Sequence, residues 1–405
     1  MSILKNYKSS ILLLAAILVG SIIGAIMGES ASFFQPLADL FLNLLYCIVV
    51  PMIFVSLVSA ISKMTDLVKL GKILSIMIGL FILTGIITAV YMGVFVTALD
   101  PTKGTNLVMN EVVDNLSASN NYLAMFTVND FYQLMSRKNL MALIVFSIGT
   151  GVAIASMKNK TQMVIDFFDQ MLAVIMKLVG FIMKLAPLGL GAFFATLVGK
   201  YGSSIAGPLS RSIIIYMVAA VVFYFLSNSI FAWIGAGHKG FKAYWKNILP
   251  PTLTSLGTCS SAASIPTNLV ASNNIGISEE ITDLTIPLGA NLHKDGAVLI
   301  QILKIAFMCN IYGMNFMSPS IFLTAVCVSV LASCVMGAIP AGGYVGEIFI
   351  VSAFGFPPES IPIMVLIGTI TDAPATAINV TGDVGVAMVL NRIMDGKNWL
   401  KNKLA

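Results

Sequence analysis

Long apolar runs alternate along the chain with short polar connections that carry most of its lysines. An α-helix needs about 20 residues to cross a bilayer, and apolar runs of that order recur from one end of the sequence to the other. They predict eight membrane-spanning helices, at residues 11–27, 37–61, 73–99, 140–156, 163–197, 213–234, 281–312 and 361–393. Proline is expected to kink or break three of them, at Pro51, near Pro187 and near Asp372–Pro374. Residues 102–137 are polar and mixed, and we expect them to form an external excursion.

Two further apolar stretches do not suit a simple spanning helix. Residues 248–270 contain three prolines and a run of small hydroxyl residues, Ser255–Ser264. Residues 318–356 are interrupted by Gly337-Ala-Ile-Pro-Ala-Gly-Gly343. Irregular backbone at membrane depth is tolerated only where it is buried in protein or lines a cavity. We therefore predict two re-entrant helical hairpins, and an all-α integral membrane protein of eight transmembrane helices plus these hairpins.

Composition and charge agree with a bilayer environment. The 405 residues are 58% hydrophobic and 10% charged, whereas soluble domains are about 25% charged. Lysine and arginine concentrate in the connections on the side of the N-terminus, as the positive-inside rule requires of cytoplasmic loops. We expect a multi-pass protein of the inner or plasma membrane with both termini in the cytoplasm. The net charge of +5 follows from these loops, so no nucleic-acid partner is expected.

Three consecutive ionisable residues, His293, Lys294 and Asp295, lie inside an apolar run. A charge at the bilayer centre costs roughly 2.5–3.5 kcal/mol on insertion scales, so we expect these side chains to face protein, a cavity or a cargo. Gly289 and Gly296 flank them and weaken the helical pattern. An internal salt bridge is one interpretation. The other is a cargo or ion site near the membrane midplane, on a broken helix.

A second polar pattern lies on the last apolar run. Asp372, Thr376, Asn379 and Asp383 follow one another at steps of 4, 3 and 4, which places them on one face of a helix. This face is not a lipid face. It either packs against another polar helix or, together with two hairpin tips whose helix N-termini attract carboxylates, lines a binding site.

Several motifs resemble one known family in their order along the chain. They are the serine-rich hairpin ending at Pro266, Gly276-Ile-Ser, Pro287-Leu-Gly-Ala with Asp295-Gly296, Ile339-Pro-Ala-Gly, and Asn379-Val-Thr-Gly-Asp383. Over nearly its whole length the chain resembles the glutamate/neutral amino acid transporters, also called dicarboxylate/amino acid:cation symporters. The resemblance implies a homotrimer of elevator carriers, with the second hairpin as the extracellular gate. It assigns residues 1–68 and 100–205 to a scaffold and trimerisation domain, and residues 69–99 and 206–405 to a mobile transport domain.

The resemblance also implies a substrate site. It places Asp372 at the substrate amino group and Asn379 at the α-carboxylate, with Thr376 lining the same pocket. Ser260 and Ser261 match serines at the tip of the first hairpin, where the carboxylate is met.

Two departures from the family concern a second carboxylate. Carriers of acidic amino acids place an arginine three residues after the amino-binding aspartate, and this chain has Ala375 there. Another basic position, on the first hairpin, is Cys259. Without a bidentate guanidinium, glutamate and aspartate are poor candidates, and small neutral amino acids are favoured.

The sodium sites of the family are altered as well. Asp295 and Asp383 match two sodium-ligand aspartates, but His293-Lys294 replaces an Asn-Met pair. Thr84 is kept, whereas Phe81, Gly85 and Met336 replace residues that carry ligand oxygens. A hard cation such as sodium requires oxygen ligands.

We hypothesise that the Lys294 ammonium acts as a tethered cation where a sodium ion would bind, with His293 or a carboxylate carrying protons. In the alternative, Lys294 pairs structurally with an aspartate and sodium still binds at Asp295 and Asp383. The sequence thus favours a secondary transporter of small neutral amino acids, with sodium or a proton as the possible coupling ion and no cofactor. A sodium-coupled amino acid or dicarboxylate symporter is the alternative.

Two other classes of function are disfavoured. A channel would show rings of repeated charge, and an enzyme would need a nucleophile–base pair or a metal cluster. The expected partners are the amino acid substrate, membrane lipid and further copies of the chain. Glu347, in the second predicted hairpin, has no role in this interpretation, and water, Lys304 and Lys294 are its candidate contacts.

Overall fold

The structure is a computed structural model that describes residues 8–62, 67–102, 127–136, 139–157, 162–201, 206–336, 343–357, 359–397 and 399–400. Within these ranges the regular structure is entirely helical. The helices are α2 (Lys8–Met27), η1 (Gly28–Phe34), α3 (Gln35–Ser62), α4 (Leu67–Leu99), η3 (Phe131–Met135), α5 (Leu140–Ser156), α6 (Gln162–Met183), α7 (Ala186–Tyr201), α8 (Ala206–Asn247), α9 (Leu249–Thr258), α10 (Ser261–Ile275), α11 (Glu279–Leu292), α12 (Asp295–Ile311), α13 (Pro319–Met336), α14 (Gly343–Phe354) and α15 (Ser360–Asp395). The prediction of an all-α protein is confirmed.

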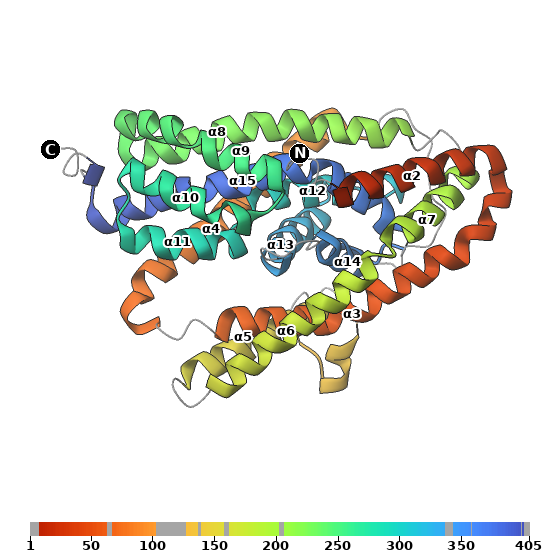
Figure 1. Cartoon of the computed structure of the whole chain (residues 1–405), viewed down its shortest axis with the longest axis horizontal. Helices are drawn as coiled ribbons and strands as arrows, with labels where there is room; N and C mark the ends of the chain where they lie inside the picture. Colours follow the sequence, from red (N-terminus) through yellow and green to blue (C-terminus); the bar gives the residue numbers. More distant parts are fainter. Residues whose placement is uncertain are drawn as a thin grey trace.

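The helices pack as two groups. In one group α2 packs against α7, and α3 packs against α5, α6 and α7. In the other, α15 packs against α8, α9, α11 and α12, and α12 also packs against α4. Figure 1 shows α3, α5 and α6 along the lower edge and α8 along the upper edge, with α13 and α14 between them. The division into a scaffold domain and a transport domain that the family resemblance implies stays a prediction.

Two helices form the centre of the second group. α12 is buried along nearly its whole length, and α15 is buried from Ser360 to Ile367 and from Ala375 to Asn391. A helix that is buried on all sides belongs to the core of a large protein. Polar residues on α12 and α15 are therefore shielded from lipid by the surrounding helices, so they must pair with one another or face a binding site.

The membrane spans are confirmed in part. Among the described residues, four helical segments are long and apolar enough to cross a bilayer: Ile11–Phe41, Ser75–Leu99, Gly207–Asn247 and Ser360–Asp395. A fifth crossing is obtained if Gln162–Ile182 and Ala186–Lys200, which meet at 51°, form one broken span. That break confirms the one predicted near Pro187. The number of eight crossings and the side of each terminus stay predictions.

The breaks between helices match the sequence patterns at two places. The first predicted hairpin is a helix pair, α9 and α10, joined at Cys259 and Ser260. The apolar run at 281–312 is divided into α11 and α12 at His293 and Lys294. The second predicted hairpin comprises α13 and α14, and its predicted tip at 337–342 lies outside the described residues, as does most of the predicted excursion at 102–137.

One predicted break is wrong. α15 runs without interruption from Ser360 to Asp395, through Asp372 and Pro374. A proline inside a helix removes one backbone hydrogen bond, but α15 is held on several sides by α8, α9, α11 and α12, and this packing maintains the helix. α3 continues as one helix through Pro51, and the kink expected there stays a prediction.

Glycines allow α2 and α7 to approach closely. A Cβ atom on Gly24 would overlap the Ala195 carbonyl oxygen and lie 3.0 Å from the Gly199 amide nitrogen. A Cβ atom on Gly199 would in turn lie 2.9 Å from the Ala31 Cβ. Small residues at such positions are typical of helix pairs in membranes, where close backbone packing replaces the hydrophobic driving force.

We expect Gly24→Ala to destabilise the protein because the new methyl group forces α2 away from α7. Gly180→Ala is the matched control, since a Cβ atom there meets nothing within 4 Å. Both substitutions gain about 1 kcal/mol of helix propensity, so the difference between them reports packing. The measurement is the fraction of purified protein that stays monodisperse in detergent after heating. Equal survival of the two variants would contradict the close approach.

Candidate functional site

The centre of the site is the two-residue break between α11 and α12. His293 (φ −99°, ψ 106°) is extended, and Lys294 (φ −135°, ψ 50°) is also outside the helical region. Asp295 then begins α12. The exposed fractions of the three residues are 1%, 6% and 2%. Their side chains are therefore enclosed by protein and do not reach lipid, as the sequence predicted.

The His293 ring lies between two carboxylates from different helices. Its Nδ1 is 2.9 Å from Asp383 Oδ1 on α15, and its Nε2 is 3.3 Å from Asp295 Oδ2 on α12. Nε2 is also 3.1 Å from Thr84 Oγ1 on α4. One face of the ring stacks on Phe81, with the centroids 4.7 Å apart and the planes at 18°. His293 thus joins α4, α12 and α15 at one point.

The neighbours of His293 define its hydrogen-bonding role. The Thr84 hydroxyl donates to the Phe81 carbonyl oxygen at 3.1 Å, so the Thr84 oxygen is left to accept from Nε2–H. Asp383 accepts from Nδ1–H, because an ionised carboxylate is an acceptor only. A neutral imidazole has a single N–H, whereas the doubly protonated ring donates from both nitrogens. The surroundings are therefore those of an imidazolium ion.

Glycines make room for this arrangement. A Cβ atom on Gly289 would lie 2.5 Å from Asp383 Oδ1, and one on Gly382 would lie 3.0 Å from His293 Cε1. The second oxygens, Asp295 Oδ1 and Asp383 Oδ2, are buried and make no hydrogen bond within the part of the chain that the structure describes. The two carboxylates thus turn one oxygen each toward the ring.

Lys294 points away from this centre toward the first hairpin. Its Nζ donates to Ser261 Oγ at 2.8 Å, at the N-terminus of α10. The sequence-based hypothesis placed the Lys294 ammonium where a sodium ion would bind, whereas His293 is the residue between the two matching aspartates. Consecutive residues of extended backbone point to opposite sides, which explains why only one of them reaches the carboxylates.

The tip of the first hairpin carries the predicted serines. Cys259 is left-handed (φ 49°, ψ 34°) and ends α9. Ser260 caps α10 by accepting from the Ala263 amide at 3.2 Å, and Ser261 begins the helix. Free backbone N–H groups at a helix N-terminus favour a carboxylate. The structure therefore brings these serines together with Lys294 at the break, as a candidate anion-binding end of the site.

The predicted polar face of α15 is present as one helical stripe. Asn379 Oδ1 accepts from the Gly296 and Ala297 amides, at 2.8 and 3.4 Å, and so caps the N-terminus of α12. The Nδ2 of Asn379 carries the N–H donors that a carboxylate accepts. Ala375 and Thr376 are buried.

Asp372 differs from the rest of the stripe because it is exposed. Both Lys294 and Lys304 interact electrostatically with its carboxylate. Among the predicted site residues it is therefore the acid that a ligand can reach.

Sequence reasoning left water, Lys304 and Lys294 open as contacts of Glu347, and the structure pairs Glu347 with Lys304. Lys304 Nζ on α12 forms an ion pair with Glu347 Oε1 on α14, and both side chains are 2% exposed. The pair lies against Gly368 of α15, where a Cβ atom would be 2.7 Å from Lys304 Nζ. The signal was two opposite charges inside apolar runs, and their separation of 43 positions left the choice of partner open.

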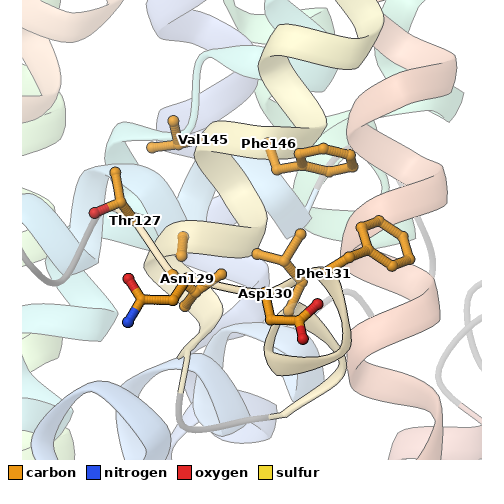
Figure 2. Close-up of a pocket in the computed structure, with 9 residues that line it drawn as sticks. Thr127, Asn129, Asp130, Phe131, Val145 and Phe146 are labelled. Carbon is orange, nitrogen blue, oxygen red and sulfur yellow. The ribbon is translucent and has the colours of Figure 1, made fainter.

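A separate cavity of about 330 Å³ lies at η3 and the start of α5, far along the sequence from these residues (Figure 2). Its walls are formed by Thr127, Val128, Asn129, Asp130, Phe131, Leu134, Ala142, Val145 and Phe146. Most of these side chains are apolar, and none belongs to the predicted site. The cavity does not offer paired positive and negative groups, so it is not the candidate site.

The chain is similar to known transport proteins over nearly its whole length. The model of the sodium:dicarboxylate symporter family matches residues 10–393. A proton/sodium-glutamate symport protein of Bacillus caldotenax is 27% identical over 409 residues, covering 96% of both chains. A C4-dicarboxylate transport protein of Bacillus subtilis (strain 168) is 24% identical, covering 96% of this chain and 94% of the relative. Human excitatory amino acid transporter 2 is 29% identical over 253 residues, which cover 60% of this chain and 43% of the relative.

We expect Gly289→Ala to destabilise the protein, because its methyl group would displace the Asp383 carboxylate from His293. Separating a buried charged pair costs about 3 kcal/mol or more. The measurement is the melting temperature in detergent. Gly79→Ala on α4 is the control, since a Cβ atom there meets nothing within 4 Å. A melting temperature that falls no further than that of the control would show that the Asp383–His293 contact contributes little.

Proposed function

Since the chain belongs to the sodium:dicarboxylate symporter family, we propose that it is a secondary transporter of small neutral amino acids that operates without sodium. The observation that supports this most strongly is the His293 ring between Asp295 and Asp383. The family resemblance identified in the sequence is confirmed, and members of this family are transporters rather than enzymes. The amino acid specificity and the ion requirement are our proposals.

The site has the polarity of an amino acid. Asp372 offers an exposed carboxylate for the substrate ammonium group. The N-terminus of α10 with Ser260 and Ser261, and the amide of Asn379, offer donors for the α-carboxylate. Lys294 at Ser261 adds a positive charge at this end.

The substrate side chain meets no bidentate cation on α15. Ala375 stands where carriers of acidic amino acids have arginine, and its methyl group is 2% exposed. A second carboxylate would therefore be desolvated without the fork that Arg provides. The named relatives transport glutamate or C4-dicarboxylates, and we expect this chain to differ from them at that point.

Sodium independence rests on the position of the imidazole. A sodium ion at Asp295 and Asp383 would need a cage of oxygen atoms, whereas here a ring with donors on both sides occupies the space between them. Phe81 covers one face of the ring and supplies no oxygen. Protonated His293 and Lys294 then supply two fixed positive charges against the three aspartates Asp295, Asp372 and Asp383. We infer that these side chains replace bound cations.

The transport cycle that we propose is that of the family. The group of helices around α15 would carry the substrate across the membrane, and the group around α3 would form the fixed, trimeric scaffold in lipid. The second hairpin, α13 and α14, would open and close the outer side. A proton on His293 that is exchanged during the cycle would make the carrier proton-coupled, and a proton that is retained would make it an exchanger or uniporter.

A sodium-coupled glutamate or dicarboxylate symporter is the second candidate. Similarity to the proton/sodium-glutamate symport protein of Bacillus caldotenax favours it, and Asp295 and Asp383 are both present. In that case His293 would turn away from the aspartates when sodium binds.

Counterflow uptake into proteoliposomes distinguishes the two candidates. We expect labelled alanine or serine to exchange equally well in sodium and in choline, because the counter-ion is part of the protein. His293→Asn removes this cation, so Asp295 and Asp383 need another one. We expect sodium to stimulate the variant about tenfold, the change that corresponds to about 1.4 kcal/mol.

The control is Lys294→Met, measured under the same conditions at two pH values. Retained sodium independence in this variant would assign the counter-ion role to His293 alone. A pH dependence that is present in the wild type and absent from His293→Asn would identify His293 as a proton carrier. Uptake of glutamate by the wild type in sodium only would reject the proposed function and support the second candidate.

A further inference from the structure

Lys304 and Glu347 form a buried ion pair that the proposed transport cycle does not use. The pair joins α12 to α14, and both side chains are 2% exposed. Removing two charges from water is costly, and a well-packed apolar pair of similar volume is often as stable. The stability of the fold therefore does not require these two charges. Their position near the substrate site indicates another role.

The pair lies beside Asp372. Gly368 is four residues before Asp372 on α15, so both residues are on the same face, about 6 Å apart along the helix axis. A Cβ atom on Gly368 would be 2.7 Å from Lys304 Nζ and 3.2 Å from Glu347 Oε1. Lys304 and Glu347 both interact electrostatically with the Asp372 carboxylate. The polar stripe of α15 thus continues past Asp372 into this pair.

The hydrogen bonds of the pair are incomplete. Glu347 Oε1 accepts from Lys304 Nζ, but Glu347 Oε2 is buried and has no hydrogen-bond partner within the described residues. An ammonium group has three N–H donors. The pair as a whole is neutral, and it presents an acceptor and a donor side by side. Of the small side-chain groups, a hydroxyl or a carboxamide can donate to one and accept from the other.

We propose that Lys304 and Glu347 form the subsite for the substrate side chain and select amino acids that carry a hydroxyl or a carboxamide. An amino acid with its ammonium group on Asp372 and its carboxylate toward Asn379 directs its side chain toward Gly368 and the pair. Gly368 has no side chain of its own, and Lys304 Nζ and Glu347 Oε1 occupy the space where its Cβ atom would lie. This inference rests on the proposed function, because it names the substrate class of the same site.

The same pair determines how strongly the site binds acidic substrates. The Lys304 ammonium attracts a carboxylate on the substrate side chain. However, Glu347 already neutralises the ammonium, and its own negative charge repels that carboxylate. Removing the charge of Glu347 while keeping its shape leaves the ammonium free to bind an anion. Glu347→Gln therefore changes the specificity in a direction that no purely structural role of the pair would produce.

The test is counterflow exchange in proteoliposomes with serine and alanine, which differ by one hydroxyl group. A site built to hydrogen-bond a hydroxyl discriminates strongly against the analogue that lacks it. We expect the wild type to prefer serine about tenfold, equivalent to about 1.4 kcal/mol. In Lys304→Met/Glu347→Leu, which replaces the pair by apolar groups, the ratio should fall to about one. In Glu347→Gln, aspartate should compete with serine at least about fivefold better than in the wild type.

Leu303→Met is the matched control, because Leu303 is also fully buried on α12 but its neighbours are apolar. It should keep both the serine preference and the weak competition by aspartate. The rise in melting temperature that serine and alanine each produce in detergent gives the same ratio for any variant that assembles but does not transport.

The outcomes separate the subsite from the proposed function. A wild type that exchanges neither serine nor alanine contradicts the proposed function and the subsite with it. A wild type that exchanges both equally, or a double variant that keeps the serine preference, overturns the subsite alone. Loss of the preference in the double variant, together with a gain of aspartate competition in Glu347→Gln, supports it.

Discussion

The structure depends on the cost of burying carboxylates away from water. Asp295 and Asp383 lie on the two most buried helices, and neither is stable there as an isolated ion. The ring of His293 meets both, and several local features follow from this requirement. The helix breaks before Asp295 so that the ring can turn toward α15, Gly289 and Gly382 leave space around it, and Thr84 presents a lone pair rather than a proton.

The four acids near the centre of the protein fall into two kinds. Asp295, Asp383 and Glu347 are buried and each faces a basic side chain from a neighbouring element or residue. Asp372 is exposed, and the two lysines act on it without an ion pair among the described contacts. The three buried acids thus have counter-ions within the protein, whereas Asp372 is the acid that we propose binds the substrate ammonium group. This division matches a carrier that binds an ammonium group reversibly.

Much of this could be predicted from the sequence, and the failures have physical causes. Helical spacing was sufficient to place Asp372, Thr376, Asn379 and Asp383 on one face, and glycines around His293 were sufficient to locate the break. The choice between His293 and Lys294 as the residue between the aspartates depends on backbone dihedral angles that no composition pattern specifies. The sequence left three candidate contacts for Glu347, and the choice of Lys304 among them depends on tertiary packing between distant segments. The effect of Pro374 on the continuity of α15 was overestimated, because packing against neighbouring helices outweighs the loss of one backbone hydrogen bond.

Asn379 has two tasks in one side chain. Its oxygen holds the first amides of α12, and its nitrogen is the donor assigned to the substrate. A substitution at this position removes a helix cap and a ligand contact together, and the two losses are not additive. The decrease in substrate affinity of such a variant would therefore include the loss of the hydrogen bonds between α15 and α12 as well as the loss of the contact with the amino acid. It would overstate the binding energy of that contact.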